Sequence, residues 1–402
     1  MSAKHDDTRS PARSISRRFK IKQESIAHIE GDLLRKVRAQ EGLSRTELAR
    51  SLGLAPSTVG IYVDHLIEEG FLSEGKRVGR EFGRPPTALG LNAQGGRFIG
   101  VDFEARNIMA TAVDFSQKPL RQFHDTIATA DTVERILEKI ENAICEVMGE
   151  SGHRVLAIGV GVPGSIDPKD GVAHYYKHIR GWHNISLVEL LTARFRVPVF
   201  LENNIRSMAL AELWFGQGRG LQDFICLGMR SGIGAGIIID GHIYHGSNNL
   251  AGEVGDWPCL ANDQKHPDGF ATLEEIASLR GIQASLAGES TLAGGEFNIS
   301  QLQKTAQEGN KNVEALLDRL ARTLGLVLSQ LNCAFNPGKI ILAGVFPAFG
   351  NVFLEKLREH FRAASRAQEL PRLVISDLGE FNGAIGAAAL AVHEWKPASQ
   401  ER

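Results

Sequence analysis

The sequence is poor in cysteine, which excludes two common ways of holding a chain together. It has only four, far apart and without a C-x-x-C pair: Cys145, Cys226, Cys259 and Cys333. Neither a disulfide framework nor a zinc site made of thiolates is therefore expected. A reduced, cytoplasmic protein fits this pattern.

Long apolar runs are also missing. The first 22 residues, MSAKHDDTRSPARSISRRFKIK, contain no apolar core of the kind that a signal peptide needs. No uninterrupted apolar run reaches the length of a transmembrane helix. The sequence therefore predicts no contact with a membrane.

Charge is nearly balanced overall but unevenly distributed. The 402 residues are 43% hydrophobic and 23% charged, which is enough for two or three folded units. Residues 1–90 carry 16 Lys and Arg and 12 Asp and Glu, a net charge of +4, and the remainder carries a net charge of −6. The front of the chain is thus the part suited to a polyanion.

The front of the chain has the pattern of a helix-turn-helix. After a polar extension over residues 1–24, predicted to be flexible, Ser25–Glu41 carries apolar residues at helical spacing. Ser44 then begins a short helix, with a Glu three residues later as in a capping box. Gly53 ends this helix, and Pro56 opens the next. We expect the inward positions of the pair to be Thr46, Leu48, Ala49, Leu54, Val59, Val63 and Leu66.

A strand, a glycine-rich basic turn and a second strand follow in EEGFLSEGKRVGREFGRPPTALGLN. Residues 25–91 therefore predict a winged helix-turn-helix domain, a fold that places its second helix in the major groove of double-stranded DNA. The alternative is a small packing domain whose basic residues form a solvated loop. We expect DNA contacts from the exposed start of the recognition helix and from the wing: Ser57, Thr58, Gly60, Ile61, Tyr62, Lys76, Arg77, Arg80 and Arg84.

The rest of the chain alternates buried-strand runs with helical segments. The runs FIGVDF, IMATAVDF, VLAIGVGVPG, VPVFLENN, DFICLGM and AGIIIDG read as strands, and Thr132 to Met148 reads as a helix. Strands interleaved with crossover helices predict an α/β fold with mixed sheets.

Several motifs of this larger part resemble, in the same order, those of the ROK (repressor, ORF, kinase) family: VPGSIDP, RGWHNISL, AELWFGQGRG, LAGEVGD, NPGKIILAG and GAIGAAALA. In the front module, SRTELA and LAPSTV resemble the winged helix of the family's repressors. The resemblance implies that residues 92–396 form a two-lobed domain of the actin, Hsp70 and sugar-kinase type. Lobe one would comprise residues 98–212 and the C-terminal helix at 382–396, and lobe two residues 213–381.

The resemblance places Asn204 at the kinase's general base, in LENNIRSMALAE. Kinases of the family read Glu-Asn-Asp here, and the aspartate removes the proton from the sugar hydroxyl that attacks ATP. An amide cannot accept this proton at neutral pH. No catalytic residue is therefore assigned.

The nucleotide motifs of the family are altered as well. Its kinases read D-x-G-G-T where this chain has Asp102 to Arg106, so the glycines are gone and Glu104 would lie beside the phosphates. The second phosphate loop, Arg230 to Gly236, keeps three of four glycines, which a turn between strands also explains. The adenine-side motif is followed by the bulky Val345 and Phe346. No cofactor is expected.

The zinc ligands of the family are missing too. Asp256 stands where the family has a histidine, Cys259 is alone, and Thr272 occupies the position of the last cysteine. Because tetrahedral zinc needs four ligands, no metal site is expected. An unusual site that combines Cys259 and His266 with Asp256 or Asp263 stays an alternative.

The sugar site is the best preserved. The family's hydroxyl-binding positions align with Asn203, Glu253 and Glu274, whose amide and carboxylates suit pairs of hydroxyl groups. Asn204, Asp256 and His178 stand around them as altered positions of the same site. The alternative is a remnant that only satisfies buried backbone groups.

Together these features predict a DNA-binding transcriptional regulator that represses carbohydrate-related genes, with a kinase-dead domain that dimerises and senses a sugar or sugar derivative. We expect a homodimer or a dimer of dimers. Two alternatives are an active ATP-dependent sugar kinase with an accessory DNA-binding domain and a regulator controlled by a partner protein.

Overall fold

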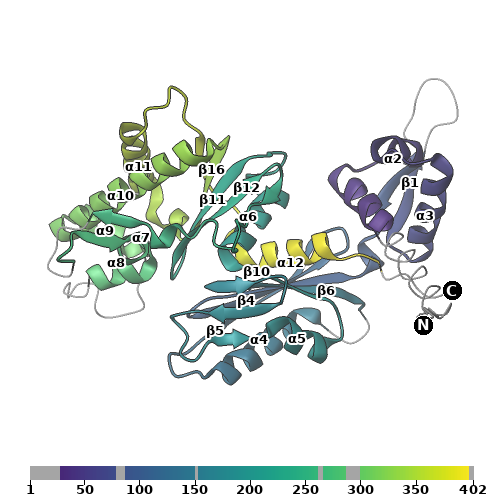
Figure 1. Cartoon of the computed structure of the whole chain (residues 1–402), viewed down its shortest axis with the longest axis horizontal. Coiled ribbons are helices and arrows are strands. Elements are labelled where there is room, and N and C mark those ends of the chain that lie inside the picture. The colour runs from purple at the N-terminus through teal and green to yellow at the C-terminus, as the bar shows by residue number, and fades with distance from the viewer. Residues whose placement is uncertain (1–27, 78–86, 150–152, 261–265, 287–298, 398–402) are drawn as a thin grey trace, which may run out of the picture.

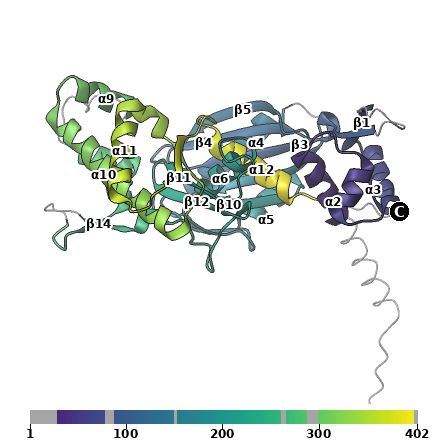
Figure 2. The same cartoon turned by 90° about the horizontal axis from the view of Figure 1, so that it is seen from above.

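The chain forms a small helical module followed by two α/β lobes, as Figure 1 shows. The computed structural model describes residues 28–77, 87–149, 153–260, 266–286 and 299–397. Seen from above, the helical module lies at one end and the helices of lobe two lie at the other (Figure 2). This arrangement confirms the predicted combination of a helix-turn-helix and a two-lobed α/β domain.

The helical module consists of a helix over residues 28–39, α2 (Arg45–Leu52), α3 (Pro56–Glu68) and the antiparallel pair β1 (Leu72–Arg77) and β2 (Thr87–Leu91). Its core is made of aliphatic side chains from all three helices, among them Leu33, Leu48 and Val63, each fully buried. The first helix therefore lies within the range predicted from the apolar spacing.

Lobe one is built on a five-stranded sheet of order β10-β6-β3-β4-β5. Its strands are β3 (Arg97–Phe103), β4 (Asn107–Asp114), β5 (Pro119–Thr126), β6 (Val155–Val162) and β10 (Val199–Asn203), and η1 (Ala93–Gly95) precedes them. β3, β6 and β10 are parallel, whereas β4 and β5 are antiparallel to their neighbours. A smaller antiparallel sheet of β7 (Ser165–Asp167), β8 (Val172–Tyr175) and β9 (His183–Ile185) follows, and then α5 (Leu187–Phe195).

Lobe two repeats this plan in a sheet of order β13-β12-β11-β16-β17. The strands are β11 (Phe224–Met229), β12 (Ile233–Ile239), β13 (His242–Ile243), β16 (Lys339–Gly344) and β17 (Arg372–Ile375). Again three strands are parallel and two are antiparallel. The two lobes thus share one sheet topology, which the sequence alone did not predict.

Helices cover the sheet of lobe two and form most of its core. They are η2 (Val254–Asp256), α7 (Leu273–Ala277), α8 (Leu279–Ser285), α9 (Ile299–Gln307), α10 (Lys311–Phe335), η4 (Phe346–Phe349) and α11 (Gly350–Ala364). A hairpin of β14 (Pro258–Leu260) and β15 (Phe270–Thr272) precedes α7. None of the helices in the described ranges is long and apolar enough to cross a membrane.

Two helices cover the opposite faces of the lobe-one sheet. α4 (Val133–Met148), capped by Thr132, packs Ile136, Ile140 and Ile144 against one face. α12 (Asn382–Glu394) lies on the other face, where it runs from the lobe interface toward the helical module (Figure 1). Its close approach requires glycine in the strands: a Cβ at Gly100 would lie 2.0 Å from the Ala384 carbonyl oxygen.

α6 (Asn204–Trp214) is the helix through which the two lobes meet. It packs against α12 on one side, and its Met208 and Ala209 join the core beneath β11 and β16 of lobe two on the other. A Cβ at Gly386 would lie 1.7 Å from the Ser207 carbonyl oxygen, so the two helices touch at their backbones. Because α6 begins directly after Asn203, the predicted sugar site adjoins the helix at which the lobes meet.

An aromatic cluster joins the helical module to lobe one. The Trp395 ring, just after α12, meets the edges of Phe71, Phe98 and Phe115 at centroid distances of 5.1 to 5.9 Å. Phe71 belongs to the helical module, whereas Phe98 and Phe115 belong to lobe one. The hydrophobic core of the helical module therefore continues into the lobe, and the end of α12 lies inside it.

Candidate functional site

The start of α3 is exposed as the sequence predicted. Ser57 and Ile61 are exposed, Ile61 by 69%, and Thr58, Gly60 and Tyr62 are half-buried. The opposite side of the helix, Val59, Val63 and Leu66, is buried. Tyr62 also packs against the core of the module. The recognition helix can thus present a continuous surface to another molecule.

The capping signals of α2 are confirmed. Ser44 and Glu47 form a reciprocal capping box, and Gly53 ends the helix in a left-handed conformation at φ 65°. The expectation that Thr46 faces inward was wrong, because Thr46 is exposed. It lies two residues from Leu48, about 200° around a helix of 3.6 residues per turn, so the two side chains point to opposite sides.

Arg45 is a structural residue of this module that the sequence reasoning missed. Its Nη1 lies 2.6 Å from Asp64 Oδ1 of α3, and its Nη2 lies 3.0 Å from Glu74 Oε1 of β1. One guanidinium thus links both helices of the pair to the first wing strand. The partners lie 19 and 29 positions away, so spacing gave no signal.

The wing strands pair in antiparallel register, with Leu72 opposite Leu91. Lys76 and Arg77 end β1, where the basic turn begins. Arg80 and Arg84 lie outside the described residues. The predicted DNA contacts of these four residues stay a prediction.

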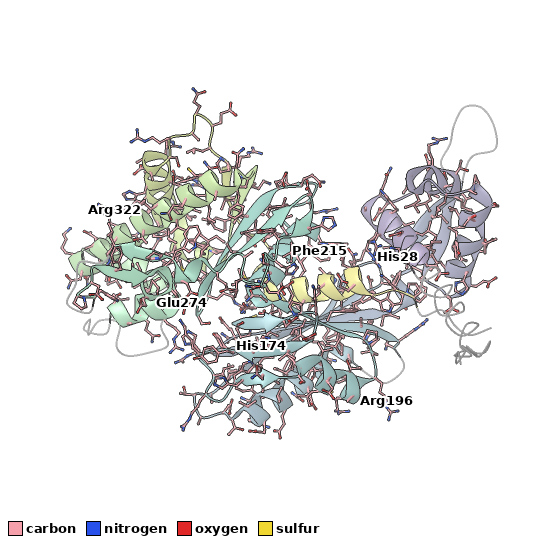
Figure 3. The ribbon with its side chains drawn as sticks, viewed as in Figure 1. His28, His174, Arg196, Phe215, Glu274 and Arg322 are labelled. Carbon is pink, nitrogen blue, oxygen red and sulfur yellow. The ribbon has the colours of Figure 1, made fainter. Side chains whose placement is uncertain are left out.

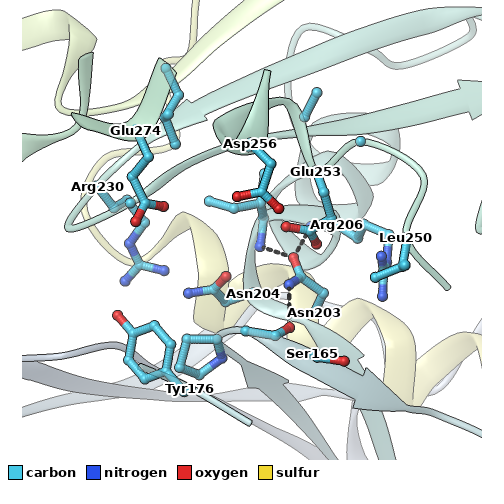
Figure 4. Close-up of a pocket in the computed structure, with 18 of the residues that line it drawn as sticks. Ser165, Tyr176, Asn203, Asn204, Arg206, Arg230, Leu250, Glu253, Asp256 and Glu274 are labelled. Atoms are coloured by element: carbon cyan, nitrogen blue, oxygen red, sulfur yellow. Dashed lines mark hydrogen bonds between the residues drawn. The ribbon is translucent and has the colours of Figure 1, made fainter. Parts of the chain in front are cut away.

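A cavity of about 280 Å³ lies between the two lobes. Five of the six predicted sugar-site residues line it, namely Asn203, Asn204, Glu253, Asp256 and Glu274, as Figure 4 shows. His178 does not line the cavity but lies behind Glu274, with its Nε2 3.5 Å from Glu274 Oε1. Glu274 itself lies on the side of lobe two that faces lobe one (Figure 3).

Asn203 uses most of its hydrogen-bonding capacity within the protein. Its Oδ1 accepts from the backbone N–H groups of Ile205 and Arg206 at 2.9 and 3.3 Å, which caps α6. Its Nδ2 donates to the Gly164 carbonyl at 3.2 Å. An amide has two N–H donors, so one donor remains for a ligand. Asn203 therefore does satisfy backbone groups, as the alternative to a sugar-binding role supposed, but it keeps one donor that this role does not use.

The carboxylates of the cavity differ in their surroundings. Burial raises the pKa of Glu253. The positive charge of Arg206 lowers this pKa, whereas the negative charges of Asp256 and Glu274 raise it further, and the net shift is upward. Within the described part of the chain, no hydrogen bond or ion pair is formed by the Glu253 side chain. Burial opposes ionisation of Glu274 too, but His178 and Lys177, which lie close to its carboxylate, lower its pKa overall.

The far end of the cleft is filled by charged groups of the chain itself. Arg230, at the turn after β11, places Nη1 2.6 Å from Asp102 Oδ2 and Nε 3.6 Å from Glu104 Oε2. Glu104 Oε2 also accepts from the backbone N–H and the hydroxyl of Ser231 at 3.1 and 2.8 Å. The Tyr176 hydroxyl completes the group 3.2 Å from Ser231 Oγ.

Burial and the charge of Arg230 act in opposite directions on these two carboxylates. Burial raises the pKa of Asp102 to about 6, although the charge of Arg230 opposes the shift. For Glu104 the charge of Arg230 and the hydrogen bonds from Ser231 and Asn107 outweigh burial, and its pKa is lowered. Glu104 is therefore ionised at neutral pH, with its charge opposite the Arg230 guanidinium.

Comparisons with known proteins match both parts of the chain. Residues 98–394 match the model of the ROK family, and residues 32–75 match that of the IclR helix-turn-helix domain. The chain belongs to the ROK family. It is 30% identical over 361 residues to the DNA-binding transcriptional dual regulator NagC of Escherichia coli, with 87% of this chain and 88% of NagC covered. It is 28% identical to the xylose repressor of Caldicellulosiruptor bescii, with 88% and 92% covered.

Solved ROK structures are similar as well. A crystal structure of a ROK family transcriptional regulator, a homologue of the E. coli MLC protein, superimposes with a TM-score of 0.76 at 24% identity and covers 92% of this chain and 97% of that one. A ROK glucokinase from Streptomyces griseus, in complex with glucose and AMPPNP, gives 0.63 at 27% identity and covers 74% and 99%. The regulator covers the helical module as well as the lobes, whereas the kinase covers a smaller part of this chain.

Arg206 and Glu202 form a second charged group in the ROK domain that the sequence reasoning did not single out. Arg206 Nε donates to Glu202 Oε1 at 2.7 Å, and His245 Nε2 lies 2.7 Å from Glu202 Oε2. Arg206 is 2% exposed and still lines the cavity. Its spacing from Glu202, four residues across the start of α6, was the available signal.

The segment that carries zinc ligands in other ROK proteins has no such arrangement in its described part. Asp256 is exposed at the end of η2, and Thr272 caps α7 in a second capping box with Glu275. Cys259 contacts the Trp257 carbonyl, and His266 lies 3.8 Å from Glu275. Asp263 lies outside the described residues. No group of three or more potential ligands occurs among those that are described.

Phe346 is a core residue of lobe two. It is fully buried and packs beside Phe349 in the main hydrophobic cluster. The sequence had suggested that the bulk of Phe346 opposes nucleotide binding. Because the side chain is buried in the core of lobe two, its bulk alone is no evidence against a bound nucleotide. The features that oppose phosphorylation are the amide at Asn204 and the charged group at Glu104.

Proposed function

We propose that this chain is a transcriptional repressor of sugar-related genes, whose helical module binds operator DNA and whose ROK lobes bind a sugar without phosphorylating it. The observation that carries this proposal is the combination of an exposed recognition helix with a cleft whose nucleotide end is filled and whose sugar end is open. The repressors and regulators to which the chain is similar over nearly their whole length support it.

Contact with DNA is assigned to Ser57, Thr58, Gly60, Ile61 and Tyr62 of α3 and to Lys76, Arg77, Arg80 and Arg84 of the wing. Operators selected from a random pool by the purified chain should contain two half-sites related by a two-fold axis, as expected of a dimer. Replacing Arg84 by Ala should reduce the logarithmic salt slope by about 0.9 if it neutralises one phosphate. A chain lacking residues 1–90 that still bound these operators would contradict the assignment.

Loss of kinase activity is supported by two contacts. The Asn204 amide donates to the Phe103 carbonyl at 3.4 Å, so the side chain at the base position is an internal donor. Glu104 accepts hydrogen bonds from the backbone N–H and the hydroxyl of Ser231, in the loop that resembles the family's second phosphate loop, and it places negative charge there. Coupled release of ADP from MgATP with any hexose, above the level of a protein-free control, would refute this part of the proposal.

A sugar or sugar derivative is proposed to bind between the lobes, where Glu253 and Glu274 accept hydrogen bonds from its hydroxyls and Asn203 donates one. Its effect on DNA binding would be a population shift between arrangements of the lobes. A thermal-shift screen with sugars and sugar phosphates identifies the ligand, because a specific ligand stabilises the state that it binds. No shift across a broad panel would favour control by a partner protein.

The route from cleft to DNA is proposed to be α12. At its start, Asn382 Nδ2 donates to the buried Glu212 of α6 at 3.0 Å, and Ser376 of lobe two hydrogen-bonds the same carboxylate. At its other end, Trp395 lies in the core shared with the helical module. A rotation of lobe two would thus act on a helix that is packed against the DNA-binding module.

A further inference from the structure

The turn between β11 and β12 has the donors of an anion-binding site. A backbone N–H and a hydroxyl of Ser231 point to one oxygen atom, and the Arg230 guanidinium adds positive charge beside it. Successive donors of this kind form sites for phosphate and carboxylate groups in proteins. Here the occupant is the Glu104 carboxylate, 127 positions away from Ser231 and part of the other lobe.

The contact of Glu104 with Arg230 and Ser231 is buried, and Asn107 holds the Glu104 carboxylate in place. Relative exposures are 1% for Asp102, 7% for Glu104 and 8% for Arg230. Asn107 Nδ2 donates to the second oxygen of Glu104 at 3.1 Å, which fixes the carboxylate plane. Buried charge pairs of this geometry are screened little by salt, unlike the exposed pairs on the surface.

The same contact joins the two lobes beside the cavity. Tyr176 of lobe one and Arg230 and Ser231 of lobe two line it, whereas Glu104 does not. We infer that Glu104 is a positioning residue: its carboxylate is an internal substitute for a bound anion, and by occupying the Arg230–Ser231 site it holds the two lobes in their observed arrangement without a nucleotide.

This inference is tested by removing the internal anion and supplying an external one. In Glu104→Ala, the site loses its occupant while Arg230 and Ser231 stay in place. Formate or inorganic phosphate should then bind the vacancy and raise the melting temperature of the variant with the logarithm of anion concentration, at matched ionic strength. Wild type and the control Glu189→Ala, an exposed residue of α5, should show no such rise.

The lobe arrangement can be read with spin labels on native cysteines. Cys145 on α4 of lobe one and Cys333 on α10 of lobe two are exposed, Cys226 is buried, and the half-buried Cys259 can be replaced by Ser. Glu104→Ala should broaden the distribution of distances between the two labels, and formate should narrow it again. Glu104→Gln, which keeps the side-chain volume, should broaden it without responding to formate.

An unchanged distance distribution in both Glu104 variants would overturn the inference, as would a melting temperature of Glu104→Ala that does not respond to either anion. Neither readout uses DNA or a sugar. Failure of the proposed repressor function would therefore appear in other experiments and leave this test intact.

Discussion

At one end of the cleft, Arg230 and Ser231 are bound by carboxylates from the opposite lobe, whereas at the other end the Glu253 side chain has no hydrogen bond or ion pair among the described residues. The filled end is an ion-paired and hydrogen-bonded contact between the lobes, in which the Asp102 oxygens and Arg230 Nη1 still lack a hydrogen bond of good geometry among the described residues. The open end keeps polar groups available to a ligand. Similarity to kinases alone could not separate the two.

Removing the cation at the filled end should have the largest effect on stability. Arg230→Ala would leave Asp102 and Glu104 buried without their counter-charge, which typically costs about 3 to 5 kcal/mol. Denaturation by urea measures the loss. Lys177→Ala is the matched control, because its ion pair with Glu274 is half exposed and should contribute less than about 1 kcal/mol. If the two variants lost the same free energy of unfolding, the buried ion pairs of Arg230 would stabilise the fold no more than the half-exposed pair of Lys177.

Removing a carboxylate at the open end should affect binding rather than folding. A hydrogen bond to a charged group contributes about 1.5 to 3 kcal/mol, so Glu253→Ala should weaken binding of a sugar found in the screen about tenfold or more. Calorimetry on wild type, Glu253→Ala and the exposed control Glu189→Ala gives the three affinities. If Glu253→Ala bound as tightly as wild type, the open end would be a remnant.

The pH dependence of two neutral variants should have opposite signs. The pKa of Glu253 is raised by folding, so its stabilising contribution is present in acid and is lost as pH rises through the folded pKa. The pKa of Glu104 is lowered, so its contribution is present at neutral pH and is lost as pH falls.

Glu253→Gln should therefore gain stability relative to wild type as pH rises above the ordinary pKa of a glutamate, about 4.3, whereas Glu104→Gln should be less stable near neutrality and lose this deficit in acid. Urea denaturation of wild type and both variants from acid to neutral pH supplies the differences. If the stability difference from wild type changed with pH in the same direction for both variants, folding would shift the pKa values of Glu253 and Glu104 in the same direction, contrary to this prediction.

The smallest expected effect is that of restoring the general base. Asn204→Asp should produce no sugar phosphorylation above background, because Glu104 would still hold the Ser231 donors and keep negative charge in the loop that resembles a phosphate loop. A coupled assay for ADP with the sugar panel measures this. Activity in Asn204→Asp alone would show that the filled end can still accept a nucleotide.

The sequence predicted what depends on local spacing. Three local features could be predicted, because each involves residues within a few positions of one another. They are the capping box at Ser44, the helix end at Gly53 and the helix that begins after Thr132. The resemblance to known motifs identified five of the six predicted sugar-site residues as residues that line the cavity. Contacts between distant segments could not be read: the pairing of Glu104 with Ser231 and the position of Trp395 in the core of the helical module depend on the assembled fold.

Operator binding measured by fluorescence anisotropy, with DNA selected by the chain itself, tests the central claim most directly. The titration is repeated with the sugar identified by the thermal-shift screen and, separately, with MgATP. The sugar should lower operator affinity, and MgATP should change neither the affinity nor the response to the sugar. Operator binding that depends on MgATP, or that ignores a sugar bound in the cleft, would contradict the proposed function.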